Sequence, residues 1–254
     1  MTVLTHQLER SLVIEAPRDV VFRYFTDPGR WAAWWGAGST IDARPGGRVF
    51  IRYPNAVEAS GDVLDISAPD RIVFTLGYAG NPSIPHGASR VTIALEAVPR
   101  GTRLRLRHEF AGADARDQHV QGWRYQLSLF ANVVANERHA GAAALADAWF
   151  KVWDEADPDA RMRALARIAS PGVRLHDKFS CVEGLEELSA HIAGAQRFMP
   201  GVTMTRRGDT RQCQGTMLAD WSASRADGQP LGNGVNVFML GPDGLIESVT
   251  GFWQ

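Results

Sequence analysis

The chain has 254 residues, of which 45% are hydrophobic and 22% charged, and its formal net charge is −1. This composition is ordinary for a globular protein, and a charge so close to zero gives no field that would favour nucleic acid or an acidic polymer. No apolar run approaches the roughly 20 residues that a membrane-spanning helix needs, and the N-terminal segment carries charges where a signal peptide is apolar. We therefore expect a cytoplasmic protein with no membrane partner.

The sequence contains no pattern typical of a metal or nucleotide site. The two cysteines, Cys181 and Cys213, have neither a CxxC partner nor a paired histidine spacing, which argues against a zinc site and against a disulfide framework. Glycine-rich phosphate loops and the HExxH and GxSxG patterns are absent in the contexts that they require. No metal and no cofactor are expected.

The order of elements changes at about residue 140. Before this point, short alternating strands lead into one long amphipathic segment, GWRYQLSLFANVVANE, whereas after it an amphipathic helix comes first and the strands follow. Each half can therefore close a core of its own, and 254 residues suit two domains. We expect domains at 1–138 and 142–254, joined by a short segment around His139–Ala144.

The first half is expected to open with a strand at Leu8–Glu15 and a helix after it. Pro17 suits the first helical turn, because its missing N–H would have no partner there. Apolar residues from Val20 to Phe25 follow at helical spacing, and Asp27–Gly29 should end this helix.

Three tryptophans, Trp31, Trp34 and Trp35, come next, and we expect their indoles to cap a cavity or to seal the core. Further strands are expected at hairpin spacing, with one long helix after them. The segment ARPGGRVFIRY is expected to be a turn into a strand, and the strands after it are Gly61–Ile66, Arg71–Leu76, Ser89–Ala97 and Thr102–Phe110. The helix, at 117–136, should lie on the concave side of a curved antiparallel sheet.

Several separated segments of the first half form a recognisable series. They are APRDVVFRYFTDPGRWAAWW, RPGG, SGDVLDI, APDRIVFTL, GTRLRLRHEF and the GW…L..L pattern of the long helix. In order and spacing they resemble the activator of Hsp90 ATPase homologue-like branch of the START-like (SRPBCC) superfamily. The resemblance implies a helix-grip fold, in which a sheet wraps around a C-terminal helix and a hydrophobic cavity lies between them. Such a fold hosts many functions, so the family name alone is weak support for a chaperone partner.

The candidate ligand-binding residues of this cavity are Trp34, Trp35, Phe50, Phe74, His86, His108, Trp123 and Leu127. The alternative for each of them is an ordinary place in the core. For His108 a hydrogen-bonded core histidine is favoured over a catalytic one, since no carboxylate is positioned to orient its ring. His86 follows the segment YAGNPSIP, which is expected to be a loop at the mouth of the cavity.

The second half is expected to begin with three helices. Apolar residues from Leu145 to Trp153 lie at helical spacing, Ala160–Ala169 forms a second helix, and the segment GLEELSAHIAGAQRFMPG a third. A strand, VRLHDKFS, separates the second and third helices. The remaining strands are expected at Val202–Arg207, Gly215–Ser224, Gly234–Leu240 and Glu247–Trp253.

This half resembles SnoaL-like, nuclear-transport-factor-2-like proteins in the LHD segment, in G…L..HI, FMPG, DW and PDGLI, and in the final VTGFW. The resemblance implies an α+β cone with a hydrophobic pocket, often in a dimer, so the overall fold class is α+β: a helix-grip domain followed by a cone. It places Asp177 where ketosteroid isomerase-like members carry a proton-transferring carboxylate. A tyrosine donor of those isomerases is replaced here by Trp149.

Asp177, with His176 and His191 as helpers, is therefore the candidate acid/base group, because a carboxylate among aromatic rings can exchange protons near neutral pH. The alternative for Asp177 is a carboxylate at a strand end that caps the local backbone or faces water. The other candidate ligand-binding residues of this half are Trp149, Trp153, Phe198, Trp221, Asn236 and Phe238.

Three functions remain open from the sequence. The favoured one is binding of a small hydrophobic, polyketide- or steroid-like molecule in one or both cavities. The second is a cofactor-free isomerase, cyclase or hydratase that uses Asp177. The third is a chaperone-interacting module, and a homodimer through the second domain is compatible with all three.

Overall fold

A computed structural model describes residues 3–254, and its chain divides into two compact units, the first ending at Ala135 and the second beginning at Asn136. The α+β fold class predicted from the sequence is confirmed. Among residues 3–254, no helix is long and apolar enough to cross a membrane.

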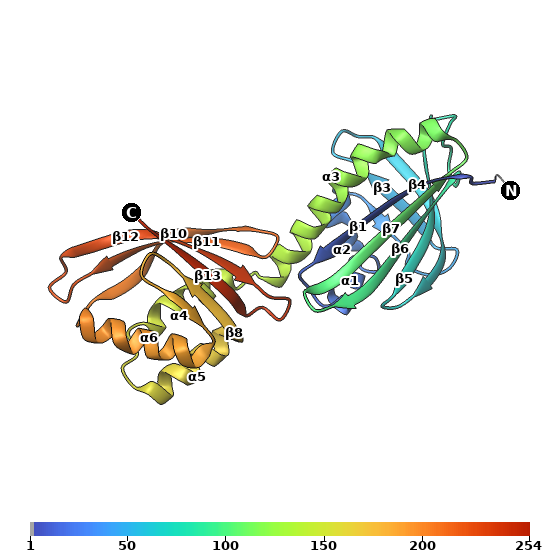
Figure 1. Cartoon of the computed structure of the whole chain (residues 1–254). Helices are drawn as coiled ribbons and strands as arrows, with labels where there is room; N and C mark the ends of the chain where they lie inside the picture. Colours follow the sequence, from blue (N-terminus) through green and yellow to red (C-terminus); the bar gives the residue numbers. More distant parts are fainter. Residues whose placement is uncertain (1–2) are drawn as a thin grey trace. The chain divides into compact units, whose positions relative to one another are not determined.

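Unit 1 is a seven-stranded antiparallel sheet that holds a long helix, α3, against one face (Figure 1). Its strands follow the order β1-β7-β6-β5-β4-β3-β2. The strands are β1 (His6–Ile14), β2 (Thr40–Ile41), β3 (Arg48–Arg52), β4 (Glu58–Ser67), β5 (Arg71–Tyr78), β6 (Ser89–Val98) and β7 (Gly101–Phe110). The helices are α1 (Arg18–Arg23), α2 (Pro28–Trp35) and α3 (Ala113–Arg138).

The segment that carries the three tryptophans is itself a helix, which the sequence analysis did not predict. The Asp27 side chain accepts a hydrogen bond from the Arg30 amide at 2.9 Å and Pro28 occupies the first turn, so the residues expected to end α1 also begin α2. Trp31, Trp34 and Trp35 all point into the core as a result.

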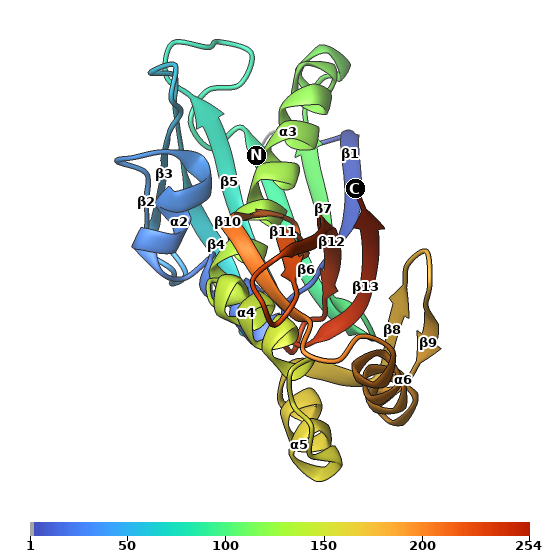
Figure 2. The same cartoon turned by 90° about the vertical axis from the view of Figure 1, so that its left-hand side faces the viewer.

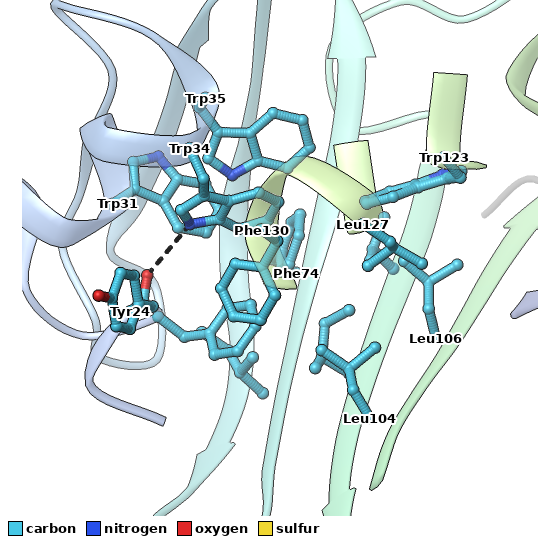
Figure 3. Packing of buried hydrophobic residues seen from close by; sticks show 14 of the residues in the cluster. Tyr24, Trp31, Trp34, Trp35, Phe74, Leu104, Leu106, Trp123, Leu127 and Phe130 are labelled. Atoms are coloured by element: carbon cyan, nitrogen blue, oxygen red, sulfur yellow. Dashed lines mark hydrogen bonds between the residues drawn. The ribbon is translucent and has the colours of Figure 1, made fainter. Parts of the chain in front are cut away.

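The core of unit 1 lies between the sheet and α3. Figure 3 shows Trp31 and Trp34 beside Phe130 of α3, and the Trp34 indole N–H donates to the Tyr24 carbonyl at 3.5 Å. On the sheet side, Leu104 and Leu106 of β7 are buried below Leu127 (Figure 3). This packing leaves the C-terminal end of α2 facing the middle of α3.

Unit 2 has a six-stranded sheet with three helices on one face (Figure 1). The strand order is β10-β11-β12-β13-β8-β9, and every pair is antiparallel except β13 with β8. The helices are α4 (Ala142–Val152), α5 (Pro158–Ile168) and α6 (Leu185–Phe198). The strands are β8 (Ala169–His176), β9 (Cys181–Glu183), β10 (Thr203–Cys213), β11 (Thr216–Ser224), β12 (Pro230–Leu240) and β13 (Ile246–Trp253).

Two features of unit 2 position its cavity. The short β8–β9 hairpin lies next to α6 (Figure 2), which brings the residues at the end of β8 towards that helix. Strand β10 runs beyond the predicted end at Arg207 to Cys213, because a register shift between Arg207 and Arg211 lets the pairing with β11 continue.

Candidate functional site

Unit 1 contains a cavity of about 710 Å³, called here the unit 1 cavity. It is bounded by the end of α2, the middle of α3, the end of β5 and the loop after β3. Its lining residues are Ala33, Trp34, Trp35, Gly36, Tyr53, Pro54, Asn55, Val57, Leu76, Tyr78, Asn81, Gln118, His119, Gly122, Trp123, Tyr125, Gln126 and Leu129. None of these carries a carboxylate, an ammonium or a guanidinium group.

Aromatic rings form one wall of the unit 1 cavity. Trp35 lies against Trp34 with ring centroids 4.2 Å apart, and it meets Tyr53 and Trp123 edge to face at 5.7 Å each. Gly36 ends α2 with φ 131°, and a Cβ there would lie 2.4 Å from the Arg52 carbonyl oxygen. A glycine is therefore required at this turn.

Tyr78, His119 and the Ala115 carbonyl at the unit 1 cavity are joined by hydrogen bonds in which donor and acceptor can be assigned. His119 Nδ1 lies 2.7 Å from the Ala115 carbonyl oxygen, so this nitrogen carries the proton and Nε2 accepts from the Tyr78 hydroxyl at 3.0 Å. Burial lowers the pKa of His119 and raises the pKa of Tyr78; burial and the neighbouring Tyr78 also raise the pKa of Tyr53. These groups are therefore uncharged at neutral pH.

His108 holds one wall of the unit 1 cavity in place. Its Nδ1 accepts from the Trp123 indole N–H at 2.9 Å, and its Nε2 lies 2.8 Å from the Ser89 hydroxyl, which donates to the Leu76 carbonyl at 2.6 Å. Both ring nitrogens are thus satisfied in the neutral form. Burial, with a smaller effect of nearby His119, keeps the pKa of His108 well below its ordinary value.

Unit 2 contains a cavity of about 720 Å³, called here the unit 2 cavity. Four of its lining residues are tryptophans, and one is a carboxylate. The lining residues are Trp149, Trp153, Leu175, Asp177, Phe179, Ser180, His191, Gly194, Ala195, Gln196, Phe198, Met199, Val202, Met204, Trp221, Ala223, Leu231, Asn236 and Trp253.

Asp177 and Asn236 lie close to each other in the unit 2 cavity, on either side of Gly251. A Cβ on Gly251 would lie 3.3 Å from Asn236 Oδ1 and 3.6 Å from Asp177 Oδ2, so a larger residue there would crowd both side chains. Trp253 Nε1 donates to Asp177 Oδ2 at 3.3 Å, and Trp221 Nε1 donates to Asn236 Oδ1 at 3.0 Å. Two indoles therefore orient the two polar side chains.

A second polar pair lies on the α6 side of the unit 2 cavity. His191 Nε2 is 2.9 Å from the Ser180 hydroxyl, and the His191 ring meets the Trp153 ring edge to face at 5.9 Å. Gln196 donates to the Trp153 carbonyl at 2.8 Å and ties α6 to the end of α4. Among residues 3–254, no group of three or more His, Cys, Asp and Glu side chains could hold a metal ion.

Residues 15–135 match the sequence model of the family described as Activator of Hsp90 ATPase homolog 1-like protein. This segment is an Activator of Hsp90 ATPase homolog 1-like domain. It spans the α1 and α2 helices, the sheet from β2 to β7 and most of α3, and it therefore includes every lining residue of the unit 1 cavity. No curated protein matches the chain.

Three solved structures are similar to about half of the chain each. A protein of the SnoaL-like family from Agrobacterium tumefaciens has 23% identity and a TM-score of 0.43, covering 46% of this chain and 98% of its own. CalU16 from Micromonospora echinospora has 27% identity and a TM-score of 0.41, covering 52% and 76%. The Aha1 dimer from Colwellia psychrerythraea has 15% identity and a TM-score of 0.42, covering 48% and 91%.

In the Activator of Hsp90 ATPase homolog 1-like domain, three of the predicted site residues line the cavity: Trp34, Trp35 and Trp123. Phe74 and Leu127 lie instead in the packed core, where Phe74 meets the Trp31 ring at 5.9 Å. Both residues lie on the same inward face as the cavity residues of their elements. The aromatic rings packed around them separate them from the cavity.

Phe50, His86 and His108 also lie outside the lining of the unit 1 cavity. Val49 and Ile51 are buried, so strand alternation turns Phe50 to the opposite face of β3. His86 is 55% exposed and pairs with the Ser60 hydroxyl at 2.8 Å. His108 acts behind the wall, through Trp123.

In unit 2, seven of the nine predicted residues line one cavity: Trp149, Trp153, Asp177, His191, Phe198, Trp221 and Asn236. His176 is exposed and lies outside the lining, because strand alternation places it opposite its neighbours Leu175 and Asp177. Phe238 is fully buried and meets the Trp149 ring edge to face at 5.9 Å.

Several lining residues were missed from the sequence although a signal was present. His119 lies four residues before Trp123 and so shares a helix face with it. Trp253 lies four residues after buried Val249 on one strand and so shares its face. Tyr53 follows the last residue of β3 and Tyr78 is the last residue of β5, so neither position gives a comparable signal.

Proposed function

We propose that this protein binds a small, mainly apolar molecule in each of its two cavities. The observation that carries the proposal is the pair of aromatic-lined cavities of about 710 and 720 Å³, each with a few fixed polar groups. A ligand site of this kind buries most of an apolar ligand and uses its polar groups to orient it. Polyketide-like and steroid-like molecules are the class of ligand that fits this description.

Each cavity has a helical glycine in its lining, and a larger residue at that position would fill one cavity and leave the other unchanged. Gly122 of α3 lines the unit 1 cavity and Gly194 of α6 lines the unit 2 cavity, and a Cβ on either would meet no atom within 4 Å. A phenylalanine at either position should therefore fill the cavity without disturbing the backbone, and helices tolerate it better than glycine.

The test is a titration of the full chain with a panel of polycyclic apolar ligands, in the wild type and in Gly122→Phe and Gly194→Phe. Each variant should lose binding in its own cavity and keep the other. Gln121→Phe and Ala190→Phe add the same ring at exposed helix positions outside the linings and serve as controls. The proposal fails if no ligand binds, or if both glycine variants bind as the wild type does.

A second candidate function, cofactor-free proton transfer, is supported by the convergence of Asp177, Asn236 and His191 in the unit 2 cavity. Asp177 would take and return a proton, and the Asn236 amide would donate to a developing negative charge on oxygen. In this case Asp177→Asn should lower the rate by about 10²- to 10⁴-fold with little change in ligand affinity. Turnover equal to that of the wild type would show that Asp177 does not transfer the proton.

Two further predictions concern partners. A homodimer through unit 2 is tested by sedimentation of the full chain over a range of concentrations. A chaperone partner is tested by measuring stimulation of an Hsp90-type ATPase, and no stimulation is expected.

A further inference from the structure

We infer that the unit 2 cavity selects a positively charged organic molecule, an amine or quaternary ammonium compound with an apolar body. This inference rests on the binding function proposed above and assigns the charge of the ligand. It uses Asp177 as a counter-ion, which is a different role from the proton transfer of the second candidate function.

The charged side chains around the unit 2 cavity are unbalanced. Asp177 is the one carboxylate in the lining, and no lysine or arginine of residues 3–254 belongs to it. The neighbouring Lys178 is exposed, with its Nζ 5.4 Å from the centroid of the Phe179 ring. His191 is the other titratable lining residue, and its Nε2 is bound to the Ser180 hydroxyl.

Asp177 is held by neutral donors. Its Oδ1 accepts from the Phe179 amide at 2.7 Å, and its Oδ2 accepts from the Trp253 indole at 3.3 Å. Among the described residues it forms no ion pair. Hydrogen bonds from neutral groups fix the carboxylate but do not cancel its charge, so this half-buried side chain gives the cavity a negative field.

The walls of the cavity are the rings that attract cations most strongly. Trp149 and Trp153 meet at an interplanar angle of 64°, and Trp221 and Trp253 at 83°, so the two rings of each pair differ in orientation. The face of an indole carries negative potential and attracts ammonium groups. The indole N–H groups of Trp221 and Trp253, which would repel a cation, already donate to Asn236 and Asp177.

The unit 1 cavity provides a comparison within the same molecule. It is also lined by tryptophan and tyrosine rings and has nearly the same volume, but its lining contains no carboxylate. Aromatic walls are therefore common to both cavities, whereas the combination of walls and an unpaired carboxylate belongs to unit 2. A preference for cations is expected in unit 2 only.

A matched pair of probes tests the inference. Choline and 3,3-dimethylbutan-1-ol have the same shape, and only choline carries the charge. The eight tryptophans give indole N–H signals in a ¹H–¹⁵N spectrum of the full chain, with Trp149, Trp153, Trp221 and Trp253 reporting on the unit 2 cavity. Choline should shift these four signals with an affinity about 10- to 30-fold above that of the alcohol.

Asp177→Asn keeps the size of the side chain and removes its charge, so it should abolish the preference for choline over the alcohol. Asp220→Asn is the control, because Asp220 lies outside the lining and pairs with Arg211 at 3.2 Å. It should keep the wild-type preference.

The inference is overturned if the two probes bind equally, if the alcohol binds more tightly, or if Asp177→Asn keeps the preference for choline. It is also overturned if neither probe shifts the four signals. The binding function itself is judged separately, by the loss of apolar ligands in Gly194→Phe. Apolar ligands that bind without a preference for charge would leave that function standing and remove this inference.

Discussion

The two units enclose cavities of almost equal volume, about 710 and 720 Å³, but the polar side chains that line the two cavities differ in charge. In unit 1 the polar groups are neutral and arranged in a chain that ends on the Ala115 carbonyl, through His119 and Tyr78. In unit 2 a carboxylate stands among four tryptophans. Volume and aromatic lining are therefore shared by two different folds, and the cavities differ in the charge of a few lining side chains.

The position of the tryptophans also differs between the units. In unit 1, Trp31, Trp34 and Trp35 are buried together in one helix, where Trp31 lies in the core and the other two also line the cavity. In unit 2, Trp149, Trp153, Trp221 and Trp253 come from two strands and the region of one helix, and they surround the cavity. Trp31 thus serves the core alone, whereas Trp34, Trp35 and Trp123 in unit 1 and the four tryptophans of unit 2 also line a cavity.

The largest test of this difference is Trp31→Ala. Trp31 is fully buried, its ring meets those of Trp34, Trp35 and Phe74, and its N–H donates to the Phe50 carbonyl at 3.2 Å. Its removal should lower the free energy of unfolding of unit 1 by about 3–5 kcal/mol. Denaturation with urea, followed through the unit 1 indole signals, measures the loss.

The matched variant in unit 2 is Trp153→Ala, since Trp153 is only half-buried and lines the cavity. It should cost clearly less stability than Trp31→Ala. Equal losses for the two variants would contradict the proposed difference between core and cavity tryptophans.

The second test is the pH dependence of stability. Burial lowers the pKa of His108 and His119 in unit 1, so the folded unit resists protonation while the unfolded chain takes up protons below about pH 6.5. Stability should be constant above pH 7 and then fall by at most about 1.4 kcal/mol per pH unit for each histidine. In unit 2, His139 is the one described histidine with a lowered pKa, so the loss of stability per pH unit should be about half of that in unit 1.

Urea titrations at pH 7.5, 6.0 and 5.0 measure the two slopes. His119→Gln keeps a polar side chain and removes one titrating group, so it should reduce the slope of unit 1 by one proton whatever its effect on stability at pH 7.5. A slope that is unchanged in this variant would show that His119 is protonated equally in the folded and unfolded chain.

The fold was largely predictable from the sequence, because strand alternation and helical spacing are local signals. The site was predictable only in part. Strand alternation alone separates His176 from Asp177 and Phe50 from its buried neighbours. No local pattern distinguishes Phe74, which packs in the core, from Trp35, which lines the cavity, since both are buried and this depends on how distant segments fill the space.

A smaller effect is expected at two helix starts of the same design. Asp27 caps α2 and Asp157 caps α5, each followed by proline and each accepting from a backbone amide, at 2.9 Å and 2.7 Å. Replacing either with alanine should cost about 1 kcal/mol in its own unit, and replacement with serine, which can also cap, much less. Chemical denaturation compares the four variants, and equal losses for alanine and serine would contradict a capping role.

The smallest effect on stability is expected at the rims of the cavities. Phe198 is 89% exposed at the unit 2 cavity and Tyr125 is 70% exposed at the unit 1 cavity. Phe198→Ser and Tyr125→Ser should change the free energy of unfolding by no more than about 0.5 kcal/mol, because neither ring is packed in the core. Each should nevertheless weaken an apolar ligand in its own cavity by about 1 kcal/mol, as measured by calorimetric titration, because a bound molecule covers part of the ring. An exposed aromatic ring that contributes to affinity and not to stability would show that the rim belongs to the binding site. Unchanged affinity in both variants would restrict each site to the buried walls.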